Sequence, residues 1–355
     1  MNQTRQKETA LILLSAVFCL GVILMTSACA SEPSYPLSDH YDGTRFFNPN
    51  DPQDHRFYDL VKFLFTRDKK VWPDTVDNEP ALDLNAPHSD GEVAVTFVNH
   101  ATVLLQFNGY TILTDPVWSE RVGPISFIGP KRVRKPGMPF DQLPKIDIVL
   151  ISHNHYDHLD TDTLKKLIAR FQPTIFVPLG DKSLIQRLGA RHVHEMDWWD
   201  SVKISRTLEI TFAPSQHFSG RSLFGFDKSL WGSYVMNVHG RKVYFGGDSG
   251  YSPYYKIIEH RFGPMDLSFL PIGSYEPRWF MKAVHMNPEE SVLAHRDLKS
   301  RETIGIHFGT FQLSDEKIDQ PQIELSEALK KLSVAPGTFI VLKEGQTRIV
   351  NLDHE

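Results

Sequence analysis

Residues 147–160 read Asp-Ile-Val-Leu-Ile-Ser-His-Asn-His-Tyr-Asp-His-Leu-Asp, and they decide how the rest of the chain is interpreted. The first six are an apolar, β-branched run, which predicts a buried strand. The imidazoles and the carboxylate that follow offer ligand atoms that zinc, iron or manganese accept. Because alternate residues of an extended turn face the same way, His153 and His155 can share one ion, while Asp157 and His158 reach a second. The stretch predicts a two-metal site, against the alternative of a polar loop that binds nothing.

The composition limits the classes of protein to which the chain can belong. Its 355 residues suffice for one large α/β domain or two smaller ones. The formal net charge of −5 argues against a nucleic-acid partner. Cys19 and Cys29 are the two cysteines, so the remainder of the chain contains no cysteine nucleophile and no thiolate ligand. Any metal there must be bound by His, Asp or Glu.

Residues 1–30 are typical of an export signal, with Arg5 and Lys7 ahead of an uncharged stretch. Three fates stay open: lipidation of Cys29, ordinary cleavage after Ala30, or an uncleaved membrane anchor. Each fate places the globular part outside the cytoplasm of a bacterial cell. We expect it in the bacterial envelope, on the periplasmic side, membrane-associated or lipid-anchored. We expect 31–90 to be a linker and lead-in segment, with a short helix at 57–65, that wraps the core.

Residues 91–352 alternate between strand-like and helix-like runs, which predicts one hydrolase domain of layered α/β architecture. The expected helices are 161–171, 181–188, 288–298 and 321–332. The expected strands include 93–98, 103–107, 110–113, 174–177, 208–212, 242–245, 267–272 and 303–306. Two further runs, 339–342 and 347–350, are expected to pair with each other and close the fold. His40, His55 and His88, which lie ahead of this domain, are expected to be structural or solvated.

Three more ligand-type residues follow apolar runs: His217, Asp248 and His307. Each alone could be a core or turn residue. The carboxyl ends of strands meet at one edge of a sheet, so together they predict a metal centre. Glycines on both sides of Asp248 allow the backbone to approach an ion closely.

The loop 118–140 is expected to lie above this site. It carries apolar Phe127 and Ile128 beside four cations, which are Lys131, Arg132, Arg134 and Lys135. Apolar residues next to cations suit an anionic membrane surface. A solvated basic loop is the alternative, and the two interpretations stay open.

The stretch 147–160 resembles the signature of the metallo-β-lactamase superfamily. Further motifs resemble the family of N-acyl-phosphatidylethanolamine-hydrolysing phospholipases D over roughly residues 38–350. They include Gly129-Pro130-Lys131-Arg132, Pro214-Ser215-Gln216-His217, Tyr275-Glu276-Pro277-Arg278-Trp279 and His307-Phe308-Gly309-Thr310-Phe311. The resemblance implies an αββα four-layer sandwich with a dinuclear zinc site between the sheets, although other divalent metals fit the same ligands.

The resemblance also implies a role for each site residue. One zinc ion would be held by His153, His155 and His217, the other by Asp157, His158 and His307, with Asp248 bridging them. Asp115 would support the ligands from behind, or is simply a turn carboxylate before Pro116. Asp157 and His285 are the candidate catalytic residues, His285 as a contact to substrate.

The implied reaction is hydrolysis of a phospholipid at a membrane surface, in which a hydroxide shared by the two zinc ions attacks phosphorus. The products would be an N-acylethanolamine and phosphatidic acid. A homodimer is left open. The alternative enzyme is a metallo-hydrolase of a lactone or β-lactam in the bacterial envelope, and the non-enzyme alternative is a metal-holding envelope protein.

Overall fold

The computed structural model describes residues 35–49, 57–78, 91–107, 109–125, 127–222 and 225–352. The chain divides into two compact units, Met1–Leu37 and Ser38–Glu355, and the fold below belongs to the second. The predictions for residues 1–30 and for Cys29 therefore lie outside the described residues. Among the helices of the described ranges, none is both long and apolar enough to cross a membrane.

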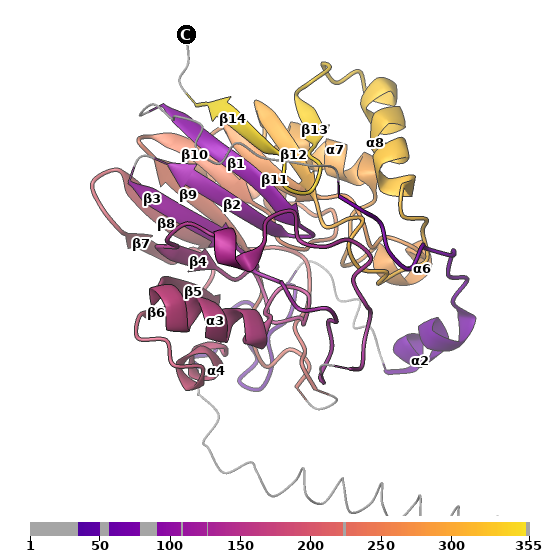
Figure 1. Ribbon diagram of the computed structural model, residues 1–355, viewed down its shortest axis with the longest axis horizontal. Coiled ribbons are helices and arrows are strands. Elements are labelled where there is room, and N and C mark those ends of the chain that lie inside the picture. The colour runs from indigo at the N-terminus through magenta and orange to yellow at the C-terminus, as the bar shows by residue number, and fades with distance from the viewer. Residues whose placement is uncertain are drawn as a thin grey trace, which may run out of the picture. The chain divides into compact units, whose positions relative to one another are not determined.

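Seven strands form the first sheet, in the order β14-β1-β2-β3-β4-β5-β6 (Figure 1). β1 and β3 are both antiparallel to β2, and β4, β5 and β6 continue parallel to β3. β1, β3 and β4 therefore end at the same edge of this sheet. The strands are β1 (Glu92–Asn99), β2 (Thr102–Phe107), β3 (Tyr110–Thr114), β4 (Ile148–Leu150), β5 (Thr174–Pro178), β6 (Val193–Met196) and β14 (Thr347–Asn351).

The second sheet also has seven strands, in the order β13-β12-β11-β10-β9-β8-β7. β8 and β10 are both antiparallel to β9, and β11 and β12 run parallel to β10. β8, β10 and β12 therefore also share an edge at their carboxyl ends. The strands are β7 (Ser201–Lys203), β8 (Leu208–Ala213), β9 (Ser233–Val238), β10 (Arg241–Phe245), β11 (Leu267–Pro271), β12 (Glu302–Ile306) and β13 (Phe339–Val341).

Helices cover the outer faces of both sheets, which confirms the αββα sandwich. On the first sheet, Leu164, Leu167 and Ile168 of α3 join a buried apolar cluster with Val149 and Ile175. α5, α7 and α8 form a layer in which α7 contacts β11 of the second sheet. The helices are α2 (Phe57–Thr66), α3 (Thr161–Phe171), α4 (Lys182–Arg187), α5 (Tyr254–Phe262), α6 (Arg278–Met281), α7 (Pro288–Asp297) and α8 (Gln320–Lys331), with a 3₁₀ turn at Phe140–Gln142.

One predicted pairing is wrong. β13 and β14 do not pair with each other: β13 runs parallel to β12, and β14 runs antiparallel to β1. The segment between them crosses from one sheet to the other, where Gly345 N donates to Phe97 O. Its five residues are the length of a hairpin loop, so the local spacing suggested a hairpin. β7, β9, α5 and α6 were not predicted.

The lead-in segment is tied to the core by hydrogen bonds from widely separated residues. Asn48 Nδ2 donates to the carbonyl of His217 at 2.8 Å. Trp72 Nε1 donates to the carbonyl of Glu316. The segment therefore touches the backbone of a predicted metal ligand.

His40 fastens the start of this segment. Its Nδ1 lies 2.6 Å from Asp39 Oδ1 and its Nε2 lies 2.7 Å from Asp197 Oδ1. Its ring stacks on Trp198 at a centroid distance of 4.3 Å. Burial opposes protonation, yet the hydrogen bonds to Asp197 and Asp39 raise the pKa of His40 above 6.5. His40 is thus structural, which is one of its two predicted roles.

We predict that His40→Ala lowers the free energy of unfolding by roughly 1 kcal/mol at about pH 6. The energy is this small because Asp39 is exposed to solvent, which screens its interaction with His40. Because the pKa of folded His40 is raised, this stabilisation is complete below the unfolded value of 6.5 and is lost as pH rises through the folded value. Denaturant titrations of both proteins at several pH values measure it. A stability difference that does not shrink with rising pH would contradict the interaction of protonated His40 with Asp39 and Asp197.

Candidate metal centre

The predicted ligands lie at the common edge where strands of both sheets end. The turn 153–158 follows β4. Two residues after the turn, Asp160 is the N-cap of α3. Asp160 Oδ1 accepts from the backbone of Asp162 and Thr163, and Asp160 Oδ2 accepts from Ser119 N. One carboxylate therefore starts the helix and ties the turn to the loop beyond β3.

Arg221, in the loop between β8 and β9, holds the same turn. Its Nη1 donates to the carbonyls of Asn154 and Leu159, at 2.9 and 2.7 Å. Its guanidinium lies over the ring of Tyr156, whose hydroxyl donates back to the Arg221 carbonyl. The turn is therefore held at both ends and at its middle, as precise ligand placement requires.

The first group of side chains is His153, His155 and His217. His155 Nδ1 lies 2.8 Å from His153 Nε2 and 3.2 Å from His217 Nε2. The other nitrogen of His217 is committed, because its Nδ1 donates to the carbonyl of Val284. Tetrahedral zinc with bonds of about 2.0–2.1 Å spaces its ligand atoms about 3.3 Å apart, which is close to these separations.

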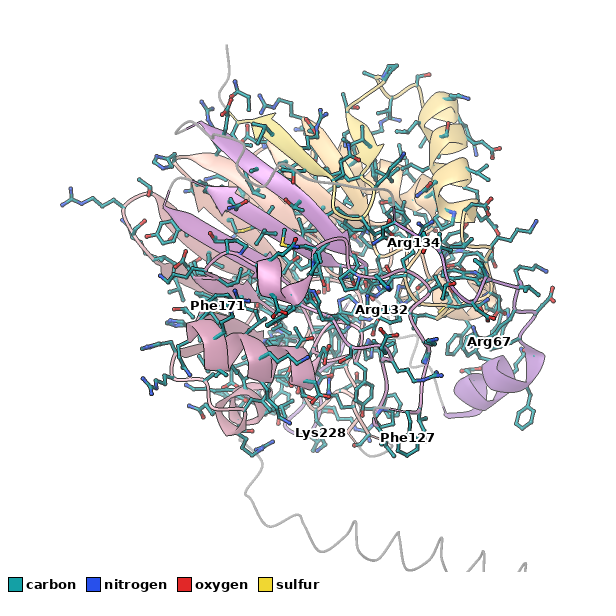
Figure 2. The ribbon with its side chains drawn as sticks, in the orientation of Figure 1. Arg67, Phe127, Arg132, Arg134, Phe171 and Lys228 are labelled. Carbon is teal, nitrogen blue, oxygen red and sulfur yellow. The ribbon has the colours of Figure 1, made fainter. Side chains whose placement is uncertain are left out.

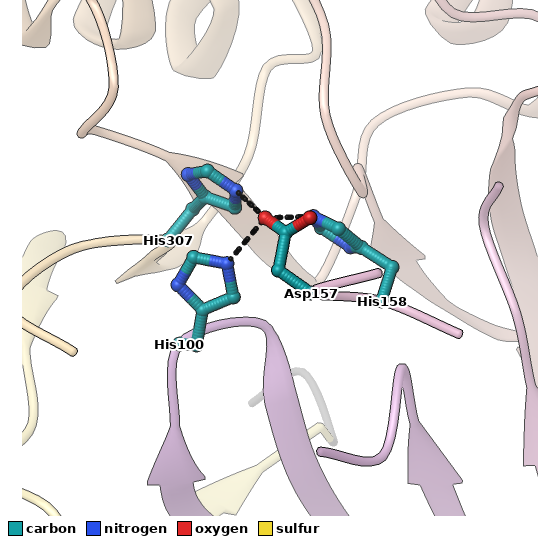
Figure 3. Close-up of side chains that lie close together, drawn as sticks. All are labelled: His100, Asp157, His158 and His307. Carbon is teal, nitrogen blue, oxygen red and sulfur yellow. Dashed lines mark hydrogen bonds and ion pairs between the residues drawn. The ribbon is translucent and has the colours of Figure 1, made fainter. Parts of the chain in front are cut away.

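The second group surrounds one oxygen of Asp157 (Figure 3). Asp157 Oδ2 lies 3.4 Å from the Nε2 atoms of both His158 and His307, and 2.9 Å from His100 Nε2. The imidazoles come from the turn after β4, from the end of β12 and from the end of β1. The sandwich therefore brings together residues that are 207 positions apart in the chain, from His100 to His307.

Asp248 reaches both groups with a single oxygen. Its Oδ2 lies 3.0 Å from His307 Nε2 and 3.2 Å from His158 Nε2 in the second group. The same oxygen lies 3.8 Å from His217 Nε2 in the first group. A carboxylate placed in this way can bridge two ions.

Protonation differs between the two groups because their neighbours differ. Burial lowers the pKa of His155 to about 3 and that of His217 to about 4, so both are neutral and offer lone pairs at neutral pH. In the second group, carboxylates, with Asp248 the strongest, overcome burial at His307 and raise its pKa to about 9, whereas burial lowers the pKa of His100 to about 3. The buried carboxylates thus need positive charge beside them, from a proton or from a cation.

The donor set fits divalent ions. Within the described part of the chain, His158 Nε2, His307 Nε2 and Asp248 Oδ1 are buried and make no hydrogen bond. Buried polar atoms without partners are costly unless something else binds them. Nitrogen and carboxylate ligands in these numbers suit zinc and other borderline divalent metals.

Asp115 and His285 lie beside the groups. Asp115 is fully buried, accepts from Ser152 N and Ser152 Oγ, and lies 2.6 Å from His158 Nδ1. It orients a predicted ligand from behind, as carboxylates do at metal-binding histidines. His285 Nδ1 lies 3.8 Å from Asp248 Oδ2, and Arg278 Nη1 donates to the His285 carbonyl. His285, His217 and Asp248 offer ligand atoms that lie within 4.8 Å of one another, so His285 stands beside the first group.

His100 is the member of the site that sequence reasoning missed. It follows β1, so the rule that ligand-type residues cluster at strand ends could have found it. Besides its contact with Asp157, its carbonyl accepts from His307 N at 2.8 Å. Its ring lies 4.0 Å from that of His307, centroid to centroid. His100 therefore touches two members of the second group.

In the basic loop 118–140, not all of the four predicted cations lie free on the surface. Arg132 is buried: its Nε donates to the carbonyl of Ser119 and its Nη2 to that of Val117. Arg134 pairs with Glu344. Lys131 and Lys135 are exposed. Only part of the cationic run is therefore available to a surface.

The fold and the site together define the class. Residues 110–308 match the family model described as the β-lactamase superfamily domain. The chain belongs to this superfamily of metallo-β-lactamase fold proteins, and it is a metal-dependent hydrolase.

Relatives narrow the comparison. The chain is 40% identical over 294 residues to N-acyl-phosphatidylethanolamine-hydrolyzing phospholipase D 1 of Caenorhabditis elegans, covering 79% of this chain and 82% of that protein. It is 39% identical over 225 residues to the mitochondrial N-acyl-phosphatidylethanolamine-hydrolyzing phospholipase D of Saccharomyces cerevisiae, covering 62% of this chain and 48% of that protein. The chain thus spans about half the length of the yeast protein.

Among solved structures, the isothiocyanate hydrolase from Delia radicum gut bacteria aligns with a TM-score of 0.58 at 21% identity, over 72% of this chain and 98% of that one. At this level of identity the likeness establishes the fold alone.

We predict that His100→Ala weakens retention of a divalent ion by about 10- to 100-fold, because Asp157 loses the donor that orients it. His100→Gln, whose amide can still donate, should recover part of the loss. Metal content after dialysis against graded chelator measures the effect, with exposed His239→Ala as control. Equal retention in His100→Ala and wild type would exclude a role for His100 at the metal.

Proposed function

We propose that the chain is a phospholipase D-type phosphodiesterase that holds two zinc ions and cleaves N-acyl-phosphatidylethanolamine to N-acylethanolamine and phosphatidic acid. The observation that carries this proposal is the position of Asp248 Oδ2, within 3.0 Å of His307 Nε2 and 3.8 Å of His217 Nε2. One carboxylate shared between an all-histidine group and a mixed group is what a pair of adjacent cations needs. The C. elegans and yeast relatives, by their names, act on this phospholipid.

The assignment of ligands is part of the proposal. One ion is held by His153, His155 and His217, the other by Asp157, His158 and His307, with Asp248 between them. Two cations so held would supply an acidified water and positive charge opposite a phosphodiester. Hydrolysis joins the oxygen of water to phosphorus and breaks the bond from phosphorus to the ethanolamine oxygen, which leaves with a proton.

The chain's own residues prepare this reaction. The neighbouring imidazoles outweigh burial and hold the pKa of Asp157 well below its usual value, so its carboxylate is ionised and can accept a hydrogen bond from water. Burial lowers the pKa of His285 well below its usual value, so it is neutral, with one nitrogen able to donate to a phosphoryl oxygen. These are the catalytic roles we assign to Asp157 and His285.

We also propose that residues 1–30 export the enzyme to the periplasmic side of a bacterial envelope and that it remains at a membrane. The lipids found there set its natural substrate. Incubation with mixed membrane lipids, followed by extraction and mass spectrometry, identifies the lipid consumed. Turnover of a chromogenic cephalosporin or a lactone, with no phosphodiester cleaved, would replace this proposal with the alternative hydrolase.

We predict that His155→Ala and Asp248→Asn each reduce phosphodiester cleavage by about 100-fold or more, together with loss of bound zinc, because each removes a ligand rather than a supporting contact. Release of N-acylethanolamine from N-acyl-phosphatidylethanolamine in detergent micelles measures activity, and elemental analysis measures zinc. Exposed Asp141→Asn serves as control for the charge change. Full activity in either ligand variant would refute the assignment.

A separate expectation concerns His285. Because we assign His285 to neither ion and its Nδ1 lies 3.8 Å from Asp248 Oδ2, His285→Ala should keep its zinc. It should nevertheless lose about 100-fold in turnover if this side chain donates to the phosphoryl oxygen. Steady-state kinetics with parallel metal analysis distinguish the roles: zinc lost in proportion to activity would make His285 a ligand, contrary to our assignment.

A further inference from the structure

In the loop between β3 and β4, residues 122–125 and 127–130 form the two limbs of a narrow finger. At its base Arg121 and Lys131 face each other as antiparallel partners. Val122 N donates to the carbonyl of Pro130 at 3.1 Å, which closes the two limbs. The segment is therefore a short hairpin that begins and ends at cations.

Two glycines make this hairpin possible. A Cβ on Gly123 would overlap the backbone of Ile128, and a Cβ on Gly129 would overlap the backbone of Val122. Gly129 also has a φ of +111°, a conformation that other residues rarely adopt. The limbs touch because side chains are absent where they meet, so the shape of the finger is defined by its sequence.

The tip of the finger is apolar and faces solvent. Phe127 is 71% exposed, Ile125 47% and Ile128 48%. Figure 2 shows Phe127 at the lower margin of the side chains drawn, where Lys228 is also labelled, with Arg132 further in. Single exposed apolar residues are common on protein surfaces, but three within four positions at the end of a hairpin form a contact surface.

The root of the finger is fixed to the metal-binding turn. Val122 belongs to a buried cluster with Val117 and Phe311, and Tyr156 packs against that cluster. Tyr156 stands between two predicted ligands in the turn 153–158. The buried guanidinium of Arg132 lies over Phe311 and reinforces the same junction. The root of the finger is thereby packed against the turn that carries the predicted ligands.

We propose that the finger inserts Ile125, Phe127 and Ile128 among the lipids of an anionic bilayer and so holds the catalytic site against the phosphate headgroups. This use of the finger rests on the proposed phospholipid substrate. Insertion removes the three apolar side chains from water, while the rigid root keeps the site beside the membrane.

The apolar tip and the cations at its base together favour a bilayer as the occupant. The protein as a whole carries a net charge of −5, yet cations, Arg121 and Lys131, stand at the base of the finger. An apolar tip with cations set behind it matches the depth profile of an anionic membrane, in which hydrocarbon lies beneath negative headgroups. A second copy of this acidic protein could attract the same cations, so the labelling experiment below distinguishes it from a bilayer.

The cysteine content allows a direct test in the full chain. With Cys19 and Cys29 changed to alanine, no cysteine remains, so Phe127→Cys gives one site for a nitrobenzoxadiazole label. Ile323→Cys on α8, where the isoleucine is 52% exposed, is the matched control. Vesicles of phosphatidylethanolamine and phosphatidylglycerol carry nitroxide groups on their acyl chains. An anchor in residues 1–30 would bring both labels near the vesicles, but only insertion places a label at acyl-chain depth.

We expect the label at position 127 to shift its emission to shorter wavelength and to be quenched by the nitroxides, while the label at 323 does neither. Equal behaviour at the two positions overturns the proposal. An emission shift at 127 that needs no vesicles and grows with protein concentration would assign the tip to a second copy of the chain, and would overturn it too.

Turnover separates this proposal from the proposed function. Phe127→Ser should lose about tenfold in cleavage of bilayer phospholipid, since one large apolar side chain no longer enters lipid. It should cleave a water-soluble phosphodiester, bis(p-nitrophenyl) phosphate, like wild type and like Ile323→Ser. Wild-type protein that cleaves neither substrate refutes the phosphodiesterase, whereas the fluorescence result still decides the role of the finger.

Discussion

The meeting of buried carboxylates and imidazoles around Asp248 is the constraint on which the rest of the structure depends. Asp248 and Asp157 lie in a water-poor interior, where an ionised carboxylate is tolerated only beside positive charge. Imidazoles of His158 and His307 stand within 3.4 Å of both carboxylates, and their Nε2 atoms have no other hydrogen-bond partner among the described residues. Such a group needs positive charge, from protons or from bound cations, and is expected in a family of metal-dependent hydrolases.

The sandwich meets this constraint through strand direction. β1, β3 and β4 in one sheet, and β8, β10 and β12 in the other, all deliver their last residues to one edge. Hydrogen bonds from behind then set the orientation of the side chains. Asp115 orients the ring of His158, and the Val284 carbonyl orients that of His217. Arg221 donates to the backbone of the turn 153–158. The rigid part of the protein is thus concentrated where charges must be placed accurately.

Sequence reasoning predicted most of this arrangement because strand ends can be recognised locally. His217, Asp248 and His307 each follow an apolar run, and the structure brings all three to the turn 153–158. Sequence reasoning failed where the pairing of a strand or the burial of a side chain depends on residues far away in the sequence. β13 and β14 are close in sequence, yet each completes a different sheet, which no local pattern reveals. The sequence pattern indicated that Arg132 is a surface cation. Its acceptors are backbone carbonyls, which only folding brings next to its guanidinium.

The crossing of the last segment between the sheets has a consequence for biosynthesis. β1 is the first strand of the domain to leave the ribosome, but one of its two neighbours, β14, is the last, and Ala94 aligns with Ile349. A nascent chain in which β13 and β14 have not yet emerged leaves an edge of each sheet unpaired, at β1 and at β12. Completion of the sandwich must therefore wait until both strands have left the ribosome.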